Sequence, residues 1–180
     1  MKYFLILTMF LSSFAFAGNV DLEKSVIKWE GGKKFKDDRH YGKIKLKSGK
    51  LDMNDKGQVV GGELVVDMDS ISVDDLQGKW ATKFLSHMKN EDFFNVPKYP
   101  VSTLMVTSIK DGVLKGKMKI LDKTRSVEIP LKKSGNAYVG SYSFDRTKWG
   151  IKYGSDSFFK GLGDKVIKNQ IKLDFKISLK

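Results

Sequence analysis

The sequence predicts a mainly β domain in which about eight antiparallel strands close into a barrel or fold into a sandwich. Two observations predict it. Apolar and polar residues alternate along most of the chain, which is the pattern of a strand with one buried face. Short loops rich in turn-forming residues separate the alternating runs, as at Asp111-Gly112. The clearest alternation is at the C-terminus, where one face carries Ile171, Leu173, Phe175, Ile177 and Leu179.

The expected strands can be placed in order along the chain. Hairpin loops are expected around Asp55-Lys56-Gly57 and Ser134-Gly135-Asn136. Pro130 faces away from the apolar side of its strand, and a proline there favours an edge or an irregular position. Glycines inside strands, such as Gly140, can supply the bends that closure needs. The strands lie around residues 27–29, 44–46, 64–68, 101–109, 114–120, 127–131, 138–144 and 171–179.

Two segments depart from the β pattern. Between Gly78 and Asn90, apolar side chains recur at helical spacing, which predicts a short amphipathic helix across an opening or face of the barrel. The stripe consists of Trp80, Phe84, His87 and Met88. Residues 150–168 lack a regular period, and we expect there a long ordered loop of the kind that often lines a binding site.

The first 17 residues are typical of a cleaved signal peptide. Lys2 is followed by an apolar run over residues 3–14, which is too short to cross a bilayer comfortably. Ala15-Phe16-Ala17 has the pattern of a cleavage site, so the mature domain is expected to span residues 18–180. An uncleaved anchor is the alternative. We expect an exported, soluble single domain.

Composition excludes several classes of function. The chain has no cysteine, which excludes thiol catalysis, disulfide exchange and cysteine-bound metals. Its formal net charge is +12, but many lysines alternate with apolar residues, as at Lys115, Lys117 and Lys119, and so belong to the wet face of a sheet. No nucleic-acid recognition motif is present, so nucleic acid is not an expected partner. Contact with an anionic membrane surface stays open.

Candidate catalytic residues are few. The only histidines are His40 and His87, and no paired-histidine spacing for zinc occurs, so no metal is expected. His87 with Asp92 could act as a base, although a structural polar contact at the helix end is the favoured interpretation. Arg146 could recognise an anionic headgroup or form a structural ion pair under a stacked ring, and the structural role is favoured.

Residues 85–100 carry a specific motif. Its sequence, LSHMKNEDFFNVPKYP, resembles the central motif H-L-x-S-x-D-F-F-x-v-x-x-y-P of the YceI-like family of periplasmic lipid-binding proteins. Residues 116–127 are similar to that family's G-x-L-t-i-x-g-x-T-k-p-v strand, with Met118, Asp122 and Ser126 at positions that differ. Residues 145–155 are similar to a branch that carries D-R-T-k-W-x-i-x-Y-x-S. The resemblance extends over essentially the whole mature chain.

The resemblance implies a lipocalin-like antiparallel barrel of eight strands with one flanking helix. It also implies a periplasmic protein that holds a long-chain lipid such as a polyisoprenoid or a fatty amide without covalent attachment. Monomer and homodimer both stay open. It implies neither catalysis nor a metal. The alternatives are a lipid-modifying enzyme that uses His87 and Asp92, and a stress-related structural or interaction module with a filled barrel.

The predicted ligand-binding residues combine the aromatic side chains with candidate polar groups at the barrel mouth. The paired aromatics at 93–94 and 158–159 are core residues by default, but would line the mouth of a hollow barrel. The full set is Trp29, His40, Trp80, Phe84, Met88, Phe93, Phe94, Arg146, Trp149, Phe158 and Phe159.

Overall fold

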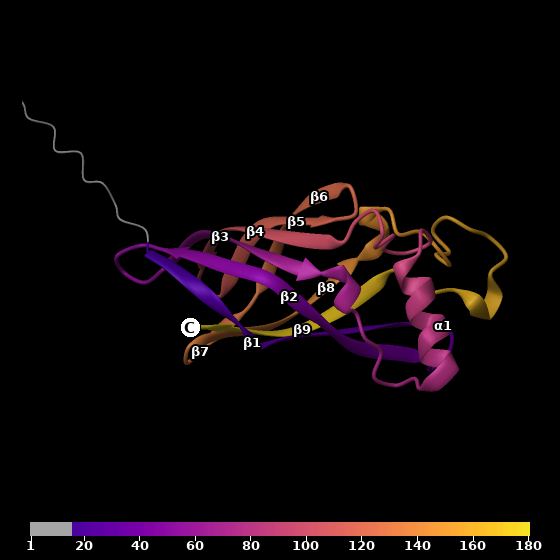
Figure 1. Cartoon of the computed structure of the whole chain (residues 1–180). Helices are drawn as coiled ribbons and strands as arrows, with labels where there is room; N and C mark the ends of the chain where they lie inside the picture. The colour runs from indigo at the N-terminus through magenta and orange to yellow at the C-terminus, as the bar shows by residue number, and fades with distance from the viewer. Residues whose placement is uncertain (1–15) are drawn as a thin grey trace, which may run out of the picture.

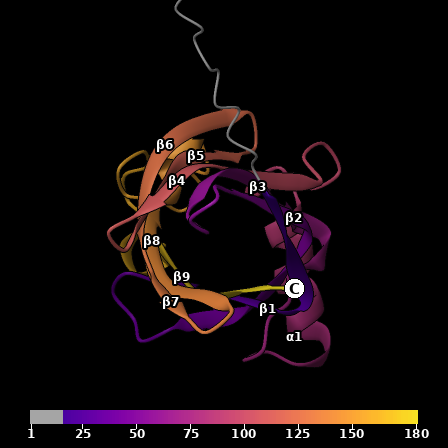
Figure 2. The same ribbon diagram turned by 90° about the vertical axis from the view of Figure 1, so that its left-hand side faces the viewer.

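Nine antiparallel strands form one continuous sheet that curls into an elongated barrel, as the computed structural model of residues 16–180 shows (Figures 1 and 2). The order in the sheet is β6-β5-β4-β3-β2-β1-β9-β8-β7. One helix, α1 (Gly78–Lys89), crosses an end of the barrel. The strands are β1 (Phe16–Gly32), β2 (Arg39–Met53), β3 (Val59–Asp67), β4 (Val101–Lys110), β5 (Val113–Ile120), β6 (Lys123–Pro130), β7 (Lys132–Ser134), β8 (Ala137–Asp145) and β9 (Gln170–Leu179).

The alternating pattern gives the predicted faces. Along β5, Leu114, Met118 and Ile120 are buried, whereas the three lysines between them are exposed. The predicted hairpin loops join β2 to β3, β4 to β5 and β7 to β8. These features confirm the β fold, the helix and the solvated basic face. Residues 1–15, which contain most of the predicted signal peptide, lie outside the described residues, and β1 begins at Phe16.

The ninth strand arises because one predicted strand divides in two. β6 pairs with β5 up to Pro130, and β7 pairs with β8 from Lys132 onward. The chain therefore changes partner at Leu131, whose backbone N–H donates to the carbonyl of Gly112. Proline has no N–H to continue a ladder, so Pro130 suits the end of a strand. β6 and β7, which follow each other in the chain, are therefore the two edge strands of the sheet. We call the place where they meet, around Leu131, the seam of the barrel.

Close packing at this seam explains why a glycine occupies position 140. A Cβ atom there would lie 2.5 Å from the Pro130 carbonyl oxygen and 2.7 Å from Cζ of Phe175. Both distances are shorter than van der Waals contact allows. Gly140 therefore lets β8 approach the corner at Leu131, as expected for a glycine that helps a barrel to close.

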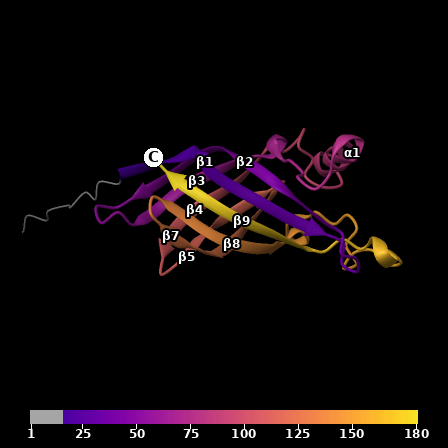
Figure 3. The ribbon, with the colours of Figure 1, turned by 90° about the horizontal axis from the view of Figure 1, so that it is seen from below.

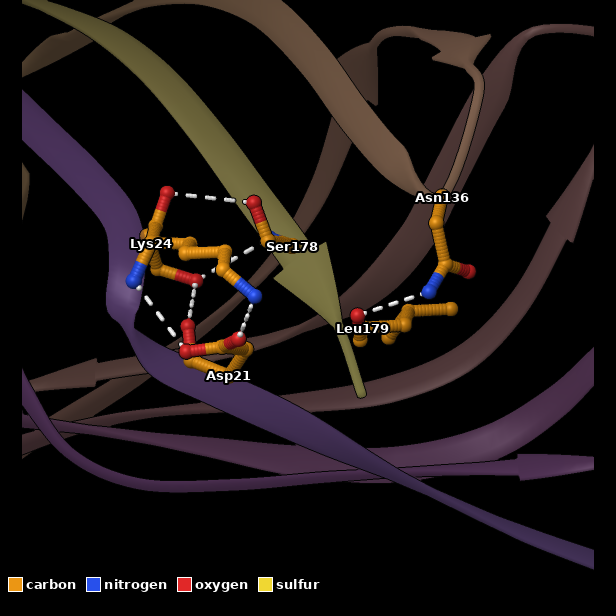
Figure 4. A network of polar contacts seen from close by, with 6 residues as sticks. Asp21, Lys24, Asn136, Ser178 and Leu179 are labelled. Atoms are coloured by element: carbon orange, nitrogen blue, oxygen red, sulfur yellow. Dashed lines mark hydrogen bonds and ion pairs between the residues drawn. The ribbon is translucent and has the colours of Figure 1, made fainter.

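A bulge in β1 is held by polar contacts at the barrel end that carries the C-terminus (Figure 4). The pairing of β1 with β9 shifts between Asp21 and Val26. The Asp21 carboxylate accepts from the backbone N–H of Lys24, and the Ser25 hydroxyl donates to the Asp21 carbonyl. The Ser25 hydroxyl also accepts from the backbone N–H of Ser178. Side chains therefore replace the ladder bonds that the bulge removes.

The helix and the long loop cover the opposite end of the barrel. α1 and residues 150–168 lie together at the end remote from the C-terminus (Figures 1 and 3). Residues 33–38 pack against the 150–168 loop: the backbone of Lys33 pairs with that of Ile167, and Lys34 forms an ion pair with Asp156. We call this part of the molecule the helix end. It carries most of the irregular structure, which is where binding residues tend to concentrate.

Candidate functional site

A cavity of about 520 Å³ occupies the interior of the barrel. Its wall receives residues from every strand except β7, together with α1 and the loops of the helix end. Most of the wall is aliphatic or aromatic. Inward positions such as Leu46, Leu104, Met118 and Leu173 line it because successive strand residues point to opposite faces. The barrel is therefore hollow rather than filled, and its size is ordinary for a small-molecule site.

Seven of the eleven predicted binding residues lie in the cavity wall. They come from β1, β2, α1, the turn after α1 and the start of the 146–149 turn, so the helix end brings together segments far apart in the sequence. Phe84 is central among them: its ring stacks on Trp29 at 6.0 Å between centroids and contacts His40 at 4.6 Å. The seven are Trp29, His40, Phe84, Met88, Phe93, Phe94 and Arg146.

The other four predicted residues are not in the cavity wall, and their contact with a ligand stays a prediction. Trp149 is buried in the core, where its Nε1 donates to the carbonyl of Met118. Trp80 is 61% exposed in the first turn of α1. Phe158 and Phe159 belong to the loop at the helix end but are about half exposed. Spacing indicated an apolar stripe or pair but could not show how far neighbouring segments would cover it.

Sequence reasoning missed several wall residues at the helix end. Lys33, Tyr153, Lys165 and Ile167 line the cavity, although none was among the predicted binding residues. Residues 150–168 were expected to line a site, but the sequence does not show that Tyr153, and not the aromatic pair at 158–159, forms part of the wall. The aliphatic wall positions were identified as strand faces and not as binding residues. Alternation shows that a residue points inward, but not whether it meets another side chain or an empty space.

His40 is fixed at the cavity wall by a carboxylate from the segment before α1. Its Nδ1 lies 2.8 Å from a carboxylate oxygen of Asp75, whose other oxygen accepts from the backbone N–H of Tyr41 at 3.0 Å. Burial is the largest single influence on the pKa of Asp75 and would raise it, but the two hydrogen bonds and smaller favourable interactions together lower the pKa below its ordinary value. The ionised carboxylate orients the imidazole beneath Phe84.

His87 forms a second polar contact, near the end of α1. Its Nε2 lies 3.0 Å from Asp92, and its ring meets Phe93 and Tyr153 edge-on at 5.0 and 4.7 Å between centroids. His87 lines the cavity, whereas Asp92 does not and is exposed. The pair connects the helix to the turn that carries Phe93 and Phe94.

Arg146 is almost completely buried, with 1% of its surface exposed. Its guanidinium donates to the carbonyls of Ile151, Ile167 and Lys168 at 2.8, 3.2 and 3.0 Å, and it lies against the ring of Phe93. Burial lowers the pKa of Arg146, and the negative charge of Asp145 opposes this shift in part. The stacked ring was expected; the partners are carbonyls rather than a carboxylate, so the predicted ion pair is absent at this position among residues 16–180.

Within residues 16–180, no group of three histidine, aspartate or glutamate side chains is placed to hold a metal ion. In the same part of the chain, no helix has the length and apolar character to cross a membrane.

Comparison with known proteins places this barrel in a family. The family model described as YceI-like domain matches residues 19–179. The chain belongs to the YceI-like family. No curated protein matches it significantly. Among the solved structures that resemble this YceI-like chain are two whose sequence identity to it is low, so they support the fold alone.

The first solved structure is BcnA of Burkholderia cenocepacia, at a TM-score of 0.64 and 17% identity, with 88% of this chain and 98% of BcnA covered. The second is a polyisoprenoid-binding domain from Saccharophagus degradans implicated in plant cell wall breakdown. It has a TM-score of 0.60 and 13% identity, with 91% of this YceI-like chain and 97% of that domain covered.

Proposed function

We propose that this YceI-like protein is a periplasmic carrier that binds one long-chain amphiphile, of isoprenoid or similar type, without covalent attachment. The observation that carries the proposal is the apolar cavity inside the barrel. The similarity in fold to a polyisoprenoid-binding domain supports it. Each methylene removed from water contributes about 0.8 kcal/mol, so an apolar interior binds a chain without specific contacts along its length.

The open cavity favours a carrier over a structural module with a filled barrel. Interiors of proteins are packed nearly as densely as organic crystals, and large apolar voids are therefore unusual. A volume of about 520 Å³ is much larger than a packing defect. An occupant that fills it would recover the contacts that the wall side chains lack.

We further propose that the protein acts as a carrier and not as an enzyme. The polar partner of the candidate base His87 is Asp92, which lies outside the cavity wall. On the cavity side, His87 contacts two aromatic rings. An aromatic surrounding is suited to packing against a chain. A base, by contrast, needs a reacting proton within hydrogen-bonding reach.

Export and contact with an anionic membrane surface complete the proposal. The N-terminal segment supports export. At the helix end, Phe35, Trp80, Phe158 and Phe159 are exposed. Residues 33–38 and 150–168 carry seven lysines and four aspartates, so this end is basic. Exposed aromatics beside lysines suit the interface of an anionic bilayer, from which a lipid could enter the cavity. Co-sedimentation with anionic and neutral vesicles tests this contact.

Native mass spectrometry of protein purified without detergent tests the carrier. We expect about one lipid per chain, released by organic extraction. The variant Leu104→Trp places a larger side chain in the wall and should reduce the amount of lipid, whereas Met105→Trp on the outer face of the same strand should not. Folded protein that yields no lipid and takes up neither palmitate nor farnesol would contradict the proposal. Chemical conversion of either compound would contradict the non-enzymatic part.

A further inference from the structure

The ionisable side chains of the cavity wall are unequal in sign. Three permanent cations, Lys33, Arg146 and Lys165, line it together with the two histidines. Across the described residues 16–180, neither aspartate nor glutamate belongs to the wall. The chain contains 21 aspartate and glutamate residues, but the ionisable residues of the cavity wall are hydrogen-bond donors and cations.

The carboxylates close to the cavity already have partners. Asp75 is bonded to His40, Asp92 to His87, and Asp38 to Lys33 at 2.8 Å. Arg146 and Lys165, in contrast, have no carboxylate at ion-pair distance among residues 16–180. Two cations of the wall therefore lack a counter-ion.

Arg146 is the more informative of the two. A buried charge is costly unless an opposite charge or hydrogen bonds compensate for it. Its three backbone carbonyls provide partial compensation and use three of the five guanidinium N–H groups. Neighbouring Asp145 acts on this charge only from beyond ion-pair distance, and its carboxylate accepts from the backbone and hydroxyl of Thr147. An oxyanion can accept from the remaining N–H groups and also neutralise the charge.

These cations lie at one end of the cavity. Lys165 and Lys33 belong to the segments of the helix end, and Arg146 is hydrogen-bonded to its 150–168 loop. Lys165 is exposed, so this end is in contact with solvent. We call the opposite end, which carries the loops β2–β3, β4–β5 and β7–β8 and the C-terminus, the hairpin end. Toward it the wall is formed mainly by aliphatic residues such as Leu51, Leu114 and Leu131. A ligand with one charged end and one apolar end fits this gradient in a single orientation.

We propose that the helix end of the cavity is an anion site, formed by Arg146 and Lys165, which selects amphiphiles with a carboxylate or phosphate headgroup over neutral ones. The proposal rests on the proposed carrier function and adds the chemical class of the ligand. The chain extends toward the hairpin end, and the headgroup meets the guanidinium and the ammonium. The contacts of Arg146 with carbonyls fix the guanidinium before the ligand arrives, which reduces the entropic cost of binding.

Competition binding with matched ligand pairs tests the selection. Palmitate is compared with palmitamide, and farnesyl phosphate with farnesol, each displacing a fluorescent lipid from delipidated full-length protein. We expect the charged member of at least one pair to bind about tenfold tighter or better, as a charge-assisted hydrogen bond predicts. Selection in only one pair identifies the headgroup as carboxylate or phosphate.

Variants assign the effect to the two cations. Lys165→Glu should lower the preference severalfold, whereas Lys117→Glu, on the outer face of β5, makes the same change of charge and should leave the preference unaltered. Arg146→Met should abolish the preference in protein shown to be folded by circular dichroism. If that variant does not fold, the result with Lys165→Glu decides.

Two negative outcomes are distinguishable. Equal affinity for charged and neutral members in the wild type, or an equal loss in Lys117→Glu and Lys165→Glu, would overturn the anion site while leaving the carrier intact. Failure of all four ligands to bind would instead contradict the carrier function itself.

Discussion

Three rings at the helix end form a small unit that controls one side of the cavity. Phe84 stacks on Trp29, with 6° between ring planes, and covers His40. Trp29 is in turn fixed by the bond from its Nε1 to the carbonyl of Ser72 at 3.0 Å. Asp75 in turn orients His40 by a hydrogen bond. Each of the three rings is therefore held by a hydrogen bond or by contact with another ring. A single residue of α1 thereby connects the helix to β1 and β2.

Replacement of Phe84 by alanine should weaken binding of palmitate and reduce stability. The change removes a ring from the wall and exposes Trp29, so the lost contacts reduce affinity roughly tenfold. Phe84 is only partly buried, and we expect a cost in unfolding free energy of about 1–3 kcal/mol, below that of a full core truncation. Fluorescence competition and urea denaturation measure the two effects.

The matched control is Trp80→Ala on the same helix. Trp80 is exposed and lies outside the cavity wall, so its removal should leave palmitate affinity within about twofold of wild type. Equal losses of affinity in both variants would mean that α1 acts through its overall stability and not through Phe84.

For single residues, the sequence predicted the kind of contact more often than where in the fold the residue would lie. Phe84 and Trp80 share an apolar stripe, and helical periodicity assigns both to one face. It does not show that the barrel lies under only part of that face. Arg146 was expected beneath an aromatic ring, but its partners come from residues 151–168, and contacts between residues without a regular period cannot be derived from spacing.

At the scale of elements, the closure of the barrel depends on one change of partner. β6 and β7 are consecutive pieces of the same stretch of chain, and they pair with opposite edges of the sheet. The alternating pattern of residues 127–134 does not reveal this, because a strand alternates in the same way whichever neighbour it pairs with. Pro130 marked the irregular position, but the identity of the second neighbour depends on the whole sheet.

Gly140→Ala should destabilise the barrel seam. The new Cβ atom would collide with the carbonyl of Pro130, and β8 would have to move away from the corner. We expect a loss of about 1–3 kcal/mol in unfolding free energy, as for an overpacked interior. Gly61→Ala in β3 is the control, because the nearest atom to its Cβ lies at 3.5 Å, which is ordinary contact. Urea denaturation of both compares them, and equal stabilities would show that the seam can relax.

At the scale of the whole molecule, the fold separates stability from binding. The three predicted hairpin loops, the C-terminus and the β1 bulge occupy one end, whereas the helix, the long loop and the ionisable wall residues occupy the other (Figures 1 and 3). Strand alternation, which is a local pattern, predicted an antiparallel barrel or sandwich, and the family resemblance implied the barrel. The cavity could not be predicted in this way, because whether Leu104 and Met118 meet side chains or an empty space depends on the curvature of the entire sheet.

A series of saturated fatty acids from decanoate upward should measure the usable length of the cavity. Each added methylene enters an apolar wall and contributes about 0.8 kcal/mol, so affinity should rise about fourfold per carbon. The rise should stop when the chain fills the available space, because further carbons stay in water. Leu104→Trp should move that limit to shorter chains, and Met105→Trp should leave it unchanged. Affinity independent of chain length would place the ligand outside the barrel, at the exposed aromatics of the helix end, where additional methylenes are not enclosed.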